Sequence, residues 1–147
     1  KVTLPSQIHQ SAASTMRGTG ISDEAASEIA AFLKTLSPPP PYLAPVTSAD
    51  IASVDRGRQL FESLSCVDCH SGSVLTSAGT YDVGLEDERG LRKFNPPSLR
   101  GVGYRERLFH DKRARGLEEV IAKFKHQIDR PLTEAEQRDL IRYLRSL

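Results

Sequence analysis

The chain has 147 residues, a formal net charge of +1 at neutral pH, 38% hydrophobic residues, only 6% aromatic residues and no tryptophan. This length suits one domain, or one domain and a fragment of another, with a thin apolar core. The small net charge excludes a general electrostatic attraction to nucleic acid or to a membrane surface.

The first predicted element is an amphipathic helix that ends near residue 36. It begins after Ser22, because serine commonly caps the N-terminus of a helix. Its apolar residues recur at helical spacing and form one face, made by Ile29, Ala30, Leu33 and Leu36. We therefore expect residues 1–36 to form a helical segment.

A proline-rich stretch, "SPPPPYLAPVTSAD", follows over residues 37–50. Four consecutive prolines cannot continue a helix, and they favour the extended polyproline II conformation. The stretch is therefore predicted to be a linker between residues 1–36 and a second unit, residues 51–147.

The second unit is predicted to be helical with long loops. A helix is expected over about residues 53–64, where Leu60, Phe61 and Leu64 recur at helical spacing. Residues 71–95 are rich in Gly, Ser, Thr and Asp and indicate a loop. The remaining predicted elements are a turn at "NPPSLRG", a short helix over about 117–125 and a terminal helix from Thr133 with Glu136 in its capping box. No alternating run is long enough to predict a strand, so the fold class is all-α.

Between helix and loop stands "SLSCVDCHSG", which holds both cysteines of the chain, Cys66 and Cys69, followed directly by His70. A redox disulfide would follow a strand, but a helical pattern precedes Cys66. A structural zinc site needs four ligands, and the chain has no further cysteine. A c-type haem needs only these three residues, two for thioethers to the vinyl groups and one as iron ligand. We therefore predict one covalently attached haem c, whose porphyrin adds apolar surface to the thin core.

Thioether attachment of haem takes place outside the cytoplasm, so we expect an exported protein that in bacteria is periplasmic. The sequence contains neither a signal peptide with a charged start and an apolar core nor an apolar run of membrane-spanning length. Because the chain begins with lysine, we expect that a signal peptide or a larger segment has been removed.

The two ends of the chain share a pattern. The segment "ISDEAASEIAAFLKTL" near the N-terminus aligns with the C-terminal "LTEAEQRDLIRYLRSL", with apolar residues in register. A potential iron ligand precedes each copy, Met16 in the first and His126 in the second. The pattern predicts two related helical segments, each with a potential iron ligand just ahead of its helix.

Four motifs occur in order in the second unit: "GRQLFESLSCVDCHSG", "FNPPSLRGV", "RLFHDKRARGLEEVI" and "LTEAEQRDLIRYLRSL". In order and spacing they resemble the C-terminal haem domain of bacterial dihaem cytochrome c peroxidases and their MauG-like relatives, over roughly residues 54–147. Residues 1–40 resemble the closing helix of the upstream haem domain in that family. The resemblance implies an all-α cytochrome c fold and a chain that is part of a longer protein with an upstream haem domain.

In the resembled family the distal iron ligand comes from the segment just before the terminal helix. Here that segment reads "AKFKHQIDR", and His126 is its only ligating side chain. The resemblance therefore implies an iron with two histidine ligands, His70 and His126. Met16 and an open, water-occupied position remain as alternatives. His126 could instead be a solvated residue beside Lys123 and Lys125, but its position and the absence of another ligating side chain in the segment favour ligation.

The resemblance also implies residues around the haem. His70 is expected to donate its second ring N–H to a carbonyl of the turn at Pro96 and Pro97. The anionic propionates are expected to bind Arg100, in the "PSLRG" motif that recurs in the family.

Further propionate ligands implied by the resemblance are His110 and Arg113, in "FHDKRAR". The relatives read "HDG" where this chain has Lys112, which puts the usual turn geometry in doubt. Individually, Arg105, Arg107 and Arg115 are interpreted as solvated charges. Together, the Arg and Lys residues between positions 100 and 115 are dense enough to form a docking face for an acidic redox partner.

Three classes of function are compatible with the sequence. Peroxide reduction needs an open iron position and an acid–base group, which the resembled peroxidases place in their other haem domain. An iron with two histidine ligands is closed to peroxide, and the acidic "LEDE" at residues 85–88 is interpreted as a solvated loop. We therefore predict an electron-transfer domain with redox protein partners and no catalytic residue of its own. The alternatives are a haem peroxidase or MauG-like oxidase that needs the upstream domain or a partner, and a haem-bearing sensor.

Overall fold

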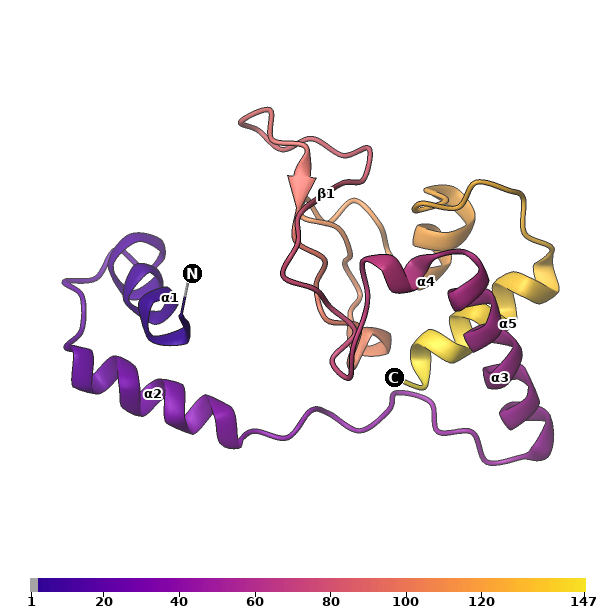
Figure 1. Cartoon of the computed structure of the whole chain (residues 1–147), viewed down its shortest axis with the longest axis horizontal. Coiled ribbons are helices and arrows are strands. Elements are labelled where there is room, and N and C mark those ends of the chain that lie inside the picture. Colours follow the sequence, from indigo (N-terminus) through magenta and orange to yellow (C-terminus); the bar gives the residue numbers. More distant parts are fainter. Residues whose placement is uncertain (1–2) are drawn as a thin grey trace. The chain divides into compact units, whose positions relative to one another are not determined.

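The structure is a computed structural model that describes residues 3–147. Its contacts divide the chain after Pro38 into two compact units (Figure 1). The N-terminal unit contains helix α1 (Leu4–Gln10), a π-helical turn (Ser11–Thr15) and helix α2 (Asp23–Thr35).

Helix α2 begins as predicted, because the Ser22 hydroxyl accepts a hydrogen bond from the backbone N–H of Ala25 at 3.1 Å. Helices α1 and α2 pack together and bury Ala26 and Ala30 of α2. The larger apolar side chains of α2, which are Ile29, Phe32 and Leu33, are exposed, and so is Leu36 directly after the helix. The predicted apolar face therefore buries only its alanine.

The second unit is mainly helical. Its elements are α3 (Ser48–Ser63), a 3₁₀ turn (Cys66–Asp68), β1 (Tyr81–Asp82), β2 (Lys93–Phe94), a 3₁₀ turn (Val102–Tyr104), α4 (Gly116–Glu118), a π-helical turn (Glu119–Lys123) and α5 (Glu134–Arg145). Strands β1 and β2 form a short antiparallel pair within the predicted loop, with Tyr81 opposite Phe94. The predicted all-α class is confirmed.

Helix α3 begins at Ser48, inside the predicted linker and not near residue 53. The reason is a capping box in which Thr47 accepts from the Asp50 N–H while the Asp50 carboxylate accepts from the Thr47 N–H, both at 3.1 Å. The residues before this cap pack on the second unit. The Leu43 N–H donates to the Arg145 carbonyl at 2.9 Å, and the Tyr42 ring meets that of Tyr104 edge to face at 5.1 Å.

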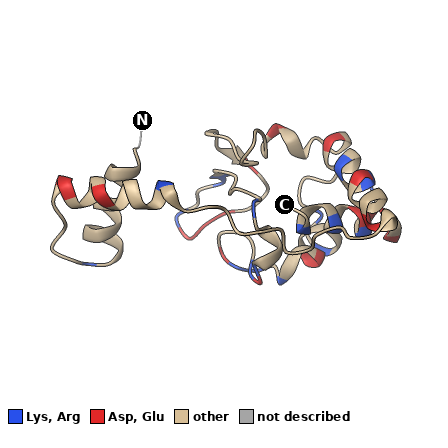
Figure 2. Cartoon of the chain, turned by 90° about the horizontal axis from the view of Figure 1, so that it is seen from below, with Lys and Arg blue, Asp and Glu red and all other residues tan. Residues whose placement is uncertain are grey.

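The core of the second unit lies where α3 packs on α5. Charged residues of both signs lie on these two helices, at the right of Figure 2. The buried apolar side chains of the core are Phe61, Val102, Leu117, Ile121, Leu140, Ile141 and Leu144. The core therefore draws on both helices, on the 3₁₀ turn after residue 101 and on the α4 region.

Helices α3 and α5 approach most closely at Gly57. A Cβ atom on Gly57 would lie 2.1 Å from the Asp139 carbonyl oxygen and 2.7 Å from the Tyr143 Cβ. The contact is also polar, because the Asp139 carboxylate accepts from the Ser53 hydroxyl at 2.5 Å and from Arg56 Nε at 2.6 Å.

We predict that Gly57→Ala destabilises the protein by about 3 kcal/mol, because one added methyl group overpacks the crossing of two helices. On an exposed helix face the same change stabilises by about 0.5–1 kcal/mol, so the expected sign is reversed here. Chemical denaturation of the haem-loaded protein, followed by circular dichroism, measures the change. The control is Gln59→Ala on the exposed face of α3, which should change stability little. A Gly57→Ala protein as stable as wild type would mean that the helices are not in close contact.

Candidate haem site

The two cysteines lie where α3 ends. Ser65 adopts the left-handed conformation (φ 57°) and turns the chain into the 3₁₀ turn that begins at Cys66. Both thiols are free, and Cys66 packs against the apolar core. Burial raises the pKa of Cys66 to about 11 and also raises the pKa of Cys69. Both sulfurs are therefore neutral thiols at the same end of one helix.

His70 is half-buried directly after this turn, and its backbone N–H donates to the Cys66 carbonyl at 2.9 Å. Its ring Nδ1 lies 3.2 Å from the Leu75 carbonyl oxygen. Burial lowers the pKa of His70, and hydrogen bonds to the carbonyls of Leu75 and Pro97 partly oppose that shift. A neutral ring that donates Nδ1–H to a carbonyl keeps Nε2 free as a metal ligand.

The loop that presents the Leu75 carbonyl is held by the "NPPSLRG" segment. Three side chains of this segment donate to carbonyls of residues 73–79. Asn95 Nδ2 donates to Ser77 and Gly79 (both 2.8 Å), Ser98 Oγ to Val74 (2.6 Å), and Arg100 to Ser73 (2.9 and 2.8 Å). In the opposite direction, Thr76 Oγ1 donates to the Pro96 carbonyl at 2.5 Å. These bonds satisfy the backbone of a loop that has little secondary structure of its own. By holding this loop, they also fix the Leu75 carbonyl to which the His70 ring is bonded.

His126 is half-buried, and its ring lies 5.5 Å from that of Phe109, which in turn packs edge to face on Phe124 at 5.3 Å. Burial is the main cause of a lowered pKa at His126, and the charge of His70 lowers it further. Both histidines therefore lie in half-buried positions of the second unit, where the neutral, metal-ligating form of the ring is favoured.

The backbone around His126 is tightly wound. The π-helical turn precedes it, its N–H donates to the Val120 carbonyl at 3.2 Å, and its neighbours Lys125 and Gln127 have positive φ angles of 47° and 53°. Left-handed backbone at two residues that are not glycine is uncommon and costs energy. The surrounding structure therefore imposes this conformation on the segment that carries His126.

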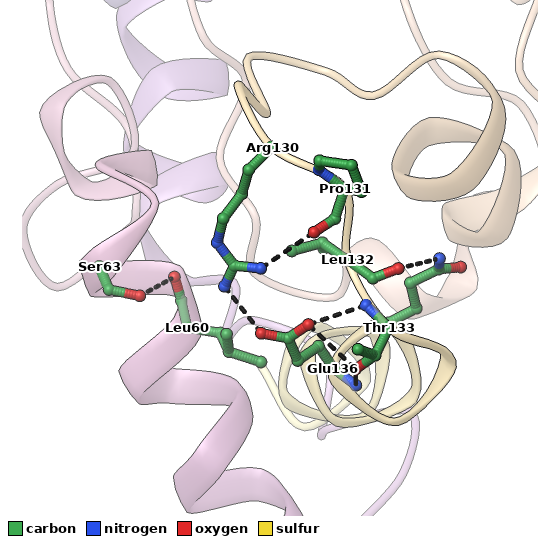
Figure 3. A network of polar contacts seen from close by, with 8 residues as sticks. Leu60, Ser63, Arg130, Pro131, Leu132, Thr133 and Glu136 are labelled. Carbon is green, nitrogen blue, oxygen red and sulfur yellow. Dashed lines mark hydrogen bonds and ion pairs between the residues drawn. The ribbon is translucent and has the colours of Figure 1, made fainter.

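Polar contacts fasten the end of this segment to α5 (Figure 3). Arg130 Nη2 pairs with Glu136 Oε1 at 2.7 Å, and Glu136 Oε2 accepts from the Thr133 N–H at 2.8 Å. The bond to Arg130 and then those to Thr133 lower the pKa of Glu136 to about 2. Because this pKa is depressed below its usual value of 4.5, the contribution to stability is present above that pH and is lost as pH falls toward 2.

The three predicted propionate ligands, Arg100, His110 and Arg113, have partners within the protein. The Arg100 guanidinium donates to the Ser73 carbonyl, as described above. His110 stacks on Phe94, with ring centroids 4.4 Å apart, and Arg113 Nε donates to Asp111 at 2.5 Å. Lys112, at the position where the relatives have glycine, itself adopts the left-handed conformation with φ 60°.

Met16 lies in the N-terminal unit, 78% exposed. It follows a π-helical turn, and its N–H donates to the Ser11 carbonyl at 2.9 Å, as the N–H of Phe124 donates to the Glu119 carbonyl at 2.8 Å in the second unit. The sequence repeat is therefore also a repeat of backbone hydrogen bonds. In this register Met16 corresponds to Phe124.

The residue that corresponds to His126 is Gly18. Its N–H donates to the Ala12 carbonyl at 3.0 Å, as the His126 N–H does to Val120, and a Cβ atom at Gly18 would lie 2.9 Å from the Ala12 oxygen. The two potential iron ligands of the sequence repeat are thus not structural equivalents, because a longer loop joins His126 to its following helix.

The donor set fits a c-type haem. Two neutral thiols and a carbonyl-bound imidazole follow one another at the end of α3, where Cys66 packs against the apolar core, and Cys66, Cys69 and His70 are the residues that would hold the group. Within residues 3–147, no three His, Cys, Asp or Glu side chains gather as donors for a free metal ion. Across the same residues, no helix is both long and apolar enough to span a bilayer.

Fold and site together define a c-type cytochrome domain. A family model described as cytochrome c matches residues 54–147, so the chain belongs to the cytochrome c family, whose haem c is covalently bound. Among solved structures, a chain of Kuenenia stuttgartiensis hydrazine synthase, pressurised with 20 bar xenon, shares the fold with a TM-score of 0.72 and 20% identity over 95% of this chain. The present chain spans 60% of that chain. No curated protein matches.

Several residues that position the site were not predicted from the sequence. Phe109 contacts His126, and the Leu75 carbonyl accepts from His70. Asn95 and Ser98 hold the loop of residues 73–79, which contains Leu75. Polar residues on either side of a Pro–Pro pair were a signal for side-chain bonds to a neighbouring loop. Phe109 carried no periodic signal, because it lies in a turn with φ 68°.

Proposed function

We propose that residues 51–147 form a monohaem electron-transfer domain with one haem c, attached at Cys66 and Cys69 and ligated by His70 and His126. The observation that carries the proposal is the position of Cys66, Cys69 and His70 directly after α3, with His70 Nδ1 3.2 Å from the Leu75 carbonyl oxygen, which leaves Nε2 to ligate a metal. When bound, the haem supplies a one-electron iron couple.

The protein's part in this function is to hold both imidazoles in place. The Leu75 and Pro97 carbonyls orient His70, and the wound backbone and the Phe109 ring restrain His126. Groups fixed in this way change little when an electron arrives, which favours fast transfer.

The acidic loop residues support an electron carrier over a self-sufficient peroxidase. Asp87 Oδ1 accepts from the backbone N–H groups of Arg89 and Leu91 at 2.9 and 2.8 Å, and Glu86 lies near Arg92. These carboxylates stabilise their own loop and are thereby engaged away from peroxide chemistry, which requires an acid–base group beside the iron.

We further propose that the domain belongs to a larger periplasmic protein of the dihaem peroxidase or MauG-like kind, with the N-terminal unit as the end of an upstream haem domain. The shared hydrogen-bond pattern of residues 11–18 and 119–126 supports this, as does the likeness to a longer chain that covers 95% of this one. The alternative function is a peroxidase or oxidase that becomes complete only with that upstream domain or a partner.

A spectroelectrochemical titration of the purified holoprotein tests the electron-transfer function. We expect one reversible one-electron wave, no carbon monoxide adduct of the ferrous protein and no peroxide turnover. The potential should be lower than that of a histidine–methionine haem, because a thioether ligand raises it. Carbon monoxide binding together with peroxide turnover by this chain alone would refute the proposal in favour of an enzyme.

A further inference from the structure

A short segment of the second unit concentrates positive charge. Residues 105–115, here called the basic loop, contain five Arg or Lys residues and two carboxylates, a local net charge of +3, while the whole chain carries only +1. All five cations are exposed. Among the ion pairs of residues 3–147, the only one from the basic loop joins Arg113 to Asp111. Four cations of the loop thus lack a carboxylate partner in the described part of the chain.

The basic loop is a defined structure. Leu108 and Ala114 close it with two backbone hydrogen bonds of 3.0 and 3.4 Å. Phe109, at the start of its tip, packs on Phe124 and His126. One aromatic ring therefore joins a positively charged surface loop to the proposed distal ligand of the haem.

We propose that the basic loop is the docking surface for an acidic redox protein, which exchanges an electron with the haem from the His126 side. This inference rests on the proposed electron-transfer function. In the reducing direction, a reduced donor loses one electron and the haem gains it, with no bond made or broken.

Charge complementarity favours a compact acidic protein as the partner. The basic loop has a net charge of +3 and the whole chain has +1, so the rest of the chain has a net charge of −2. An extended polyanion such as a nucleic acid or an anionic membrane would meet that repulsion, whereas a small acidic patch can face one loop alone. The half-exposed ring of Tyr104, directly before the loop, adds an aromatic contact of the kind enriched in protein interfaces.

The test uses a reduced plant-type [2Fe–2S] ferredoxin as an acidic one-electron probe and stopped-flow mixing with the ferric holoprotein. In the wild type, the second-order rate constant should fall as salt rises. In Arg105→Glu/Arg107→Glu, we expect it to be about tenfold lower than wild type at low ionic strength, with the difference vanishing at high salt. The matched control is Lys34→Glu/Arg89→Glu, two exposed cations outside the loop with the same change in net charge, and we expect a change below about twofold.

Three outcomes would overturn the docking surface. Equal slowing in both double variants would assign the effect to total charge, and no slowing in either would exclude the loop. Binding to phosphatidylserine vesicles that is lost only in the loop variant, with an unchanged ferredoxin rate, would assign the loop to a membrane surface. The spectroelectrochemical wave separates these outcomes from a failure of the proposed function, because small mediators reduce a functional haem in every variant.

Discussion

Replacing both Cys66 and Cys69 with serine is expected to give a chain without covalently bound haem and with a melting temperature lowered by more than about 10 °C. Serine hydroxyls cannot form the thioethers that fix the porphyrin. The loss also reaches the fold, because Cys66 packs against the core and Leu140 is the one large side chain fully buried among the described residues. A core this thin depends on the apolar surface that a porphyrin adds.

Intact mass after denaturation and a circular dichroism melt measure the two effects. Cys69→Ser alone should retain one thioether and so the haem mass, with an altered pyridine haemochrome spectrum. His110→Ala serves as the control. The His110 ring stacks on Phe94 of β2 and forms no bond that attaches the haem, so this variant should keep the full haem mass. Haem that stays attached through denaturation in the double variant would contradict the assignment of Cys66 and Cys69.

The all-α class and the caps of α2 and α5 followed from the sequence, because periodic apolar residues and capping residues act locally. Thr133 and Glu136 form the predicted capping box. The start of α3 was predicted too late for an equally local reason. Its capping residues Thr47 and Asp50 lie in a stretch whose composition indicated a linker, and the stronger proline signal hid them.

A carbonyl at Pro97 was expected beside His70, but the Leu75 carbonyl and the bonds that hold its loop could not be predicted, because they depend on contacts between two loops. Arg100 illustrates the limit, since a cation near a haem motif suggests a propionate ligand, yet its side chain donates to the Ser73 carbonyl. A long loop exposes backbone groups that need partners, and which side chain supplies them is set by the folded arrangement. The structural correspondence of His126 with Gly18, and not with Met16, could not be predicted either, because aligning the two helices does not reveal that the loops before them differ in length.

Replacing His126 with alanine is expected to convert a low-spin ferric haem with two imidazole ligands into a high-spin one. The wild-type protein should show the low-temperature EPR and near-infrared magnetic circular dichroism of bis-imidazole iron, and the variant should lose both. The removed ring is half-buried, so its removal leaves a space that water or carbon monoxide can enter. The ferrous variant should therefore bind carbon monoxide, which the wild type should not.

Two controls identify the ligand rather than a general disturbance of the site. Lys125→Ala changes the adjacent exposed residue and should leave the spectra unchanged. Met16→Ala should also have no effect, because Met16 is exposed in the N-terminal unit and corresponds in backbone register to Phe124. A thioether signature that disappears in Met16→Ala would reverse this assignment and give the distal position to the N-terminal unit. A high-spin wild type would mean that His126 does not ligate the iron, and an open iron would make the peroxidase or oxidase alternative the leading function.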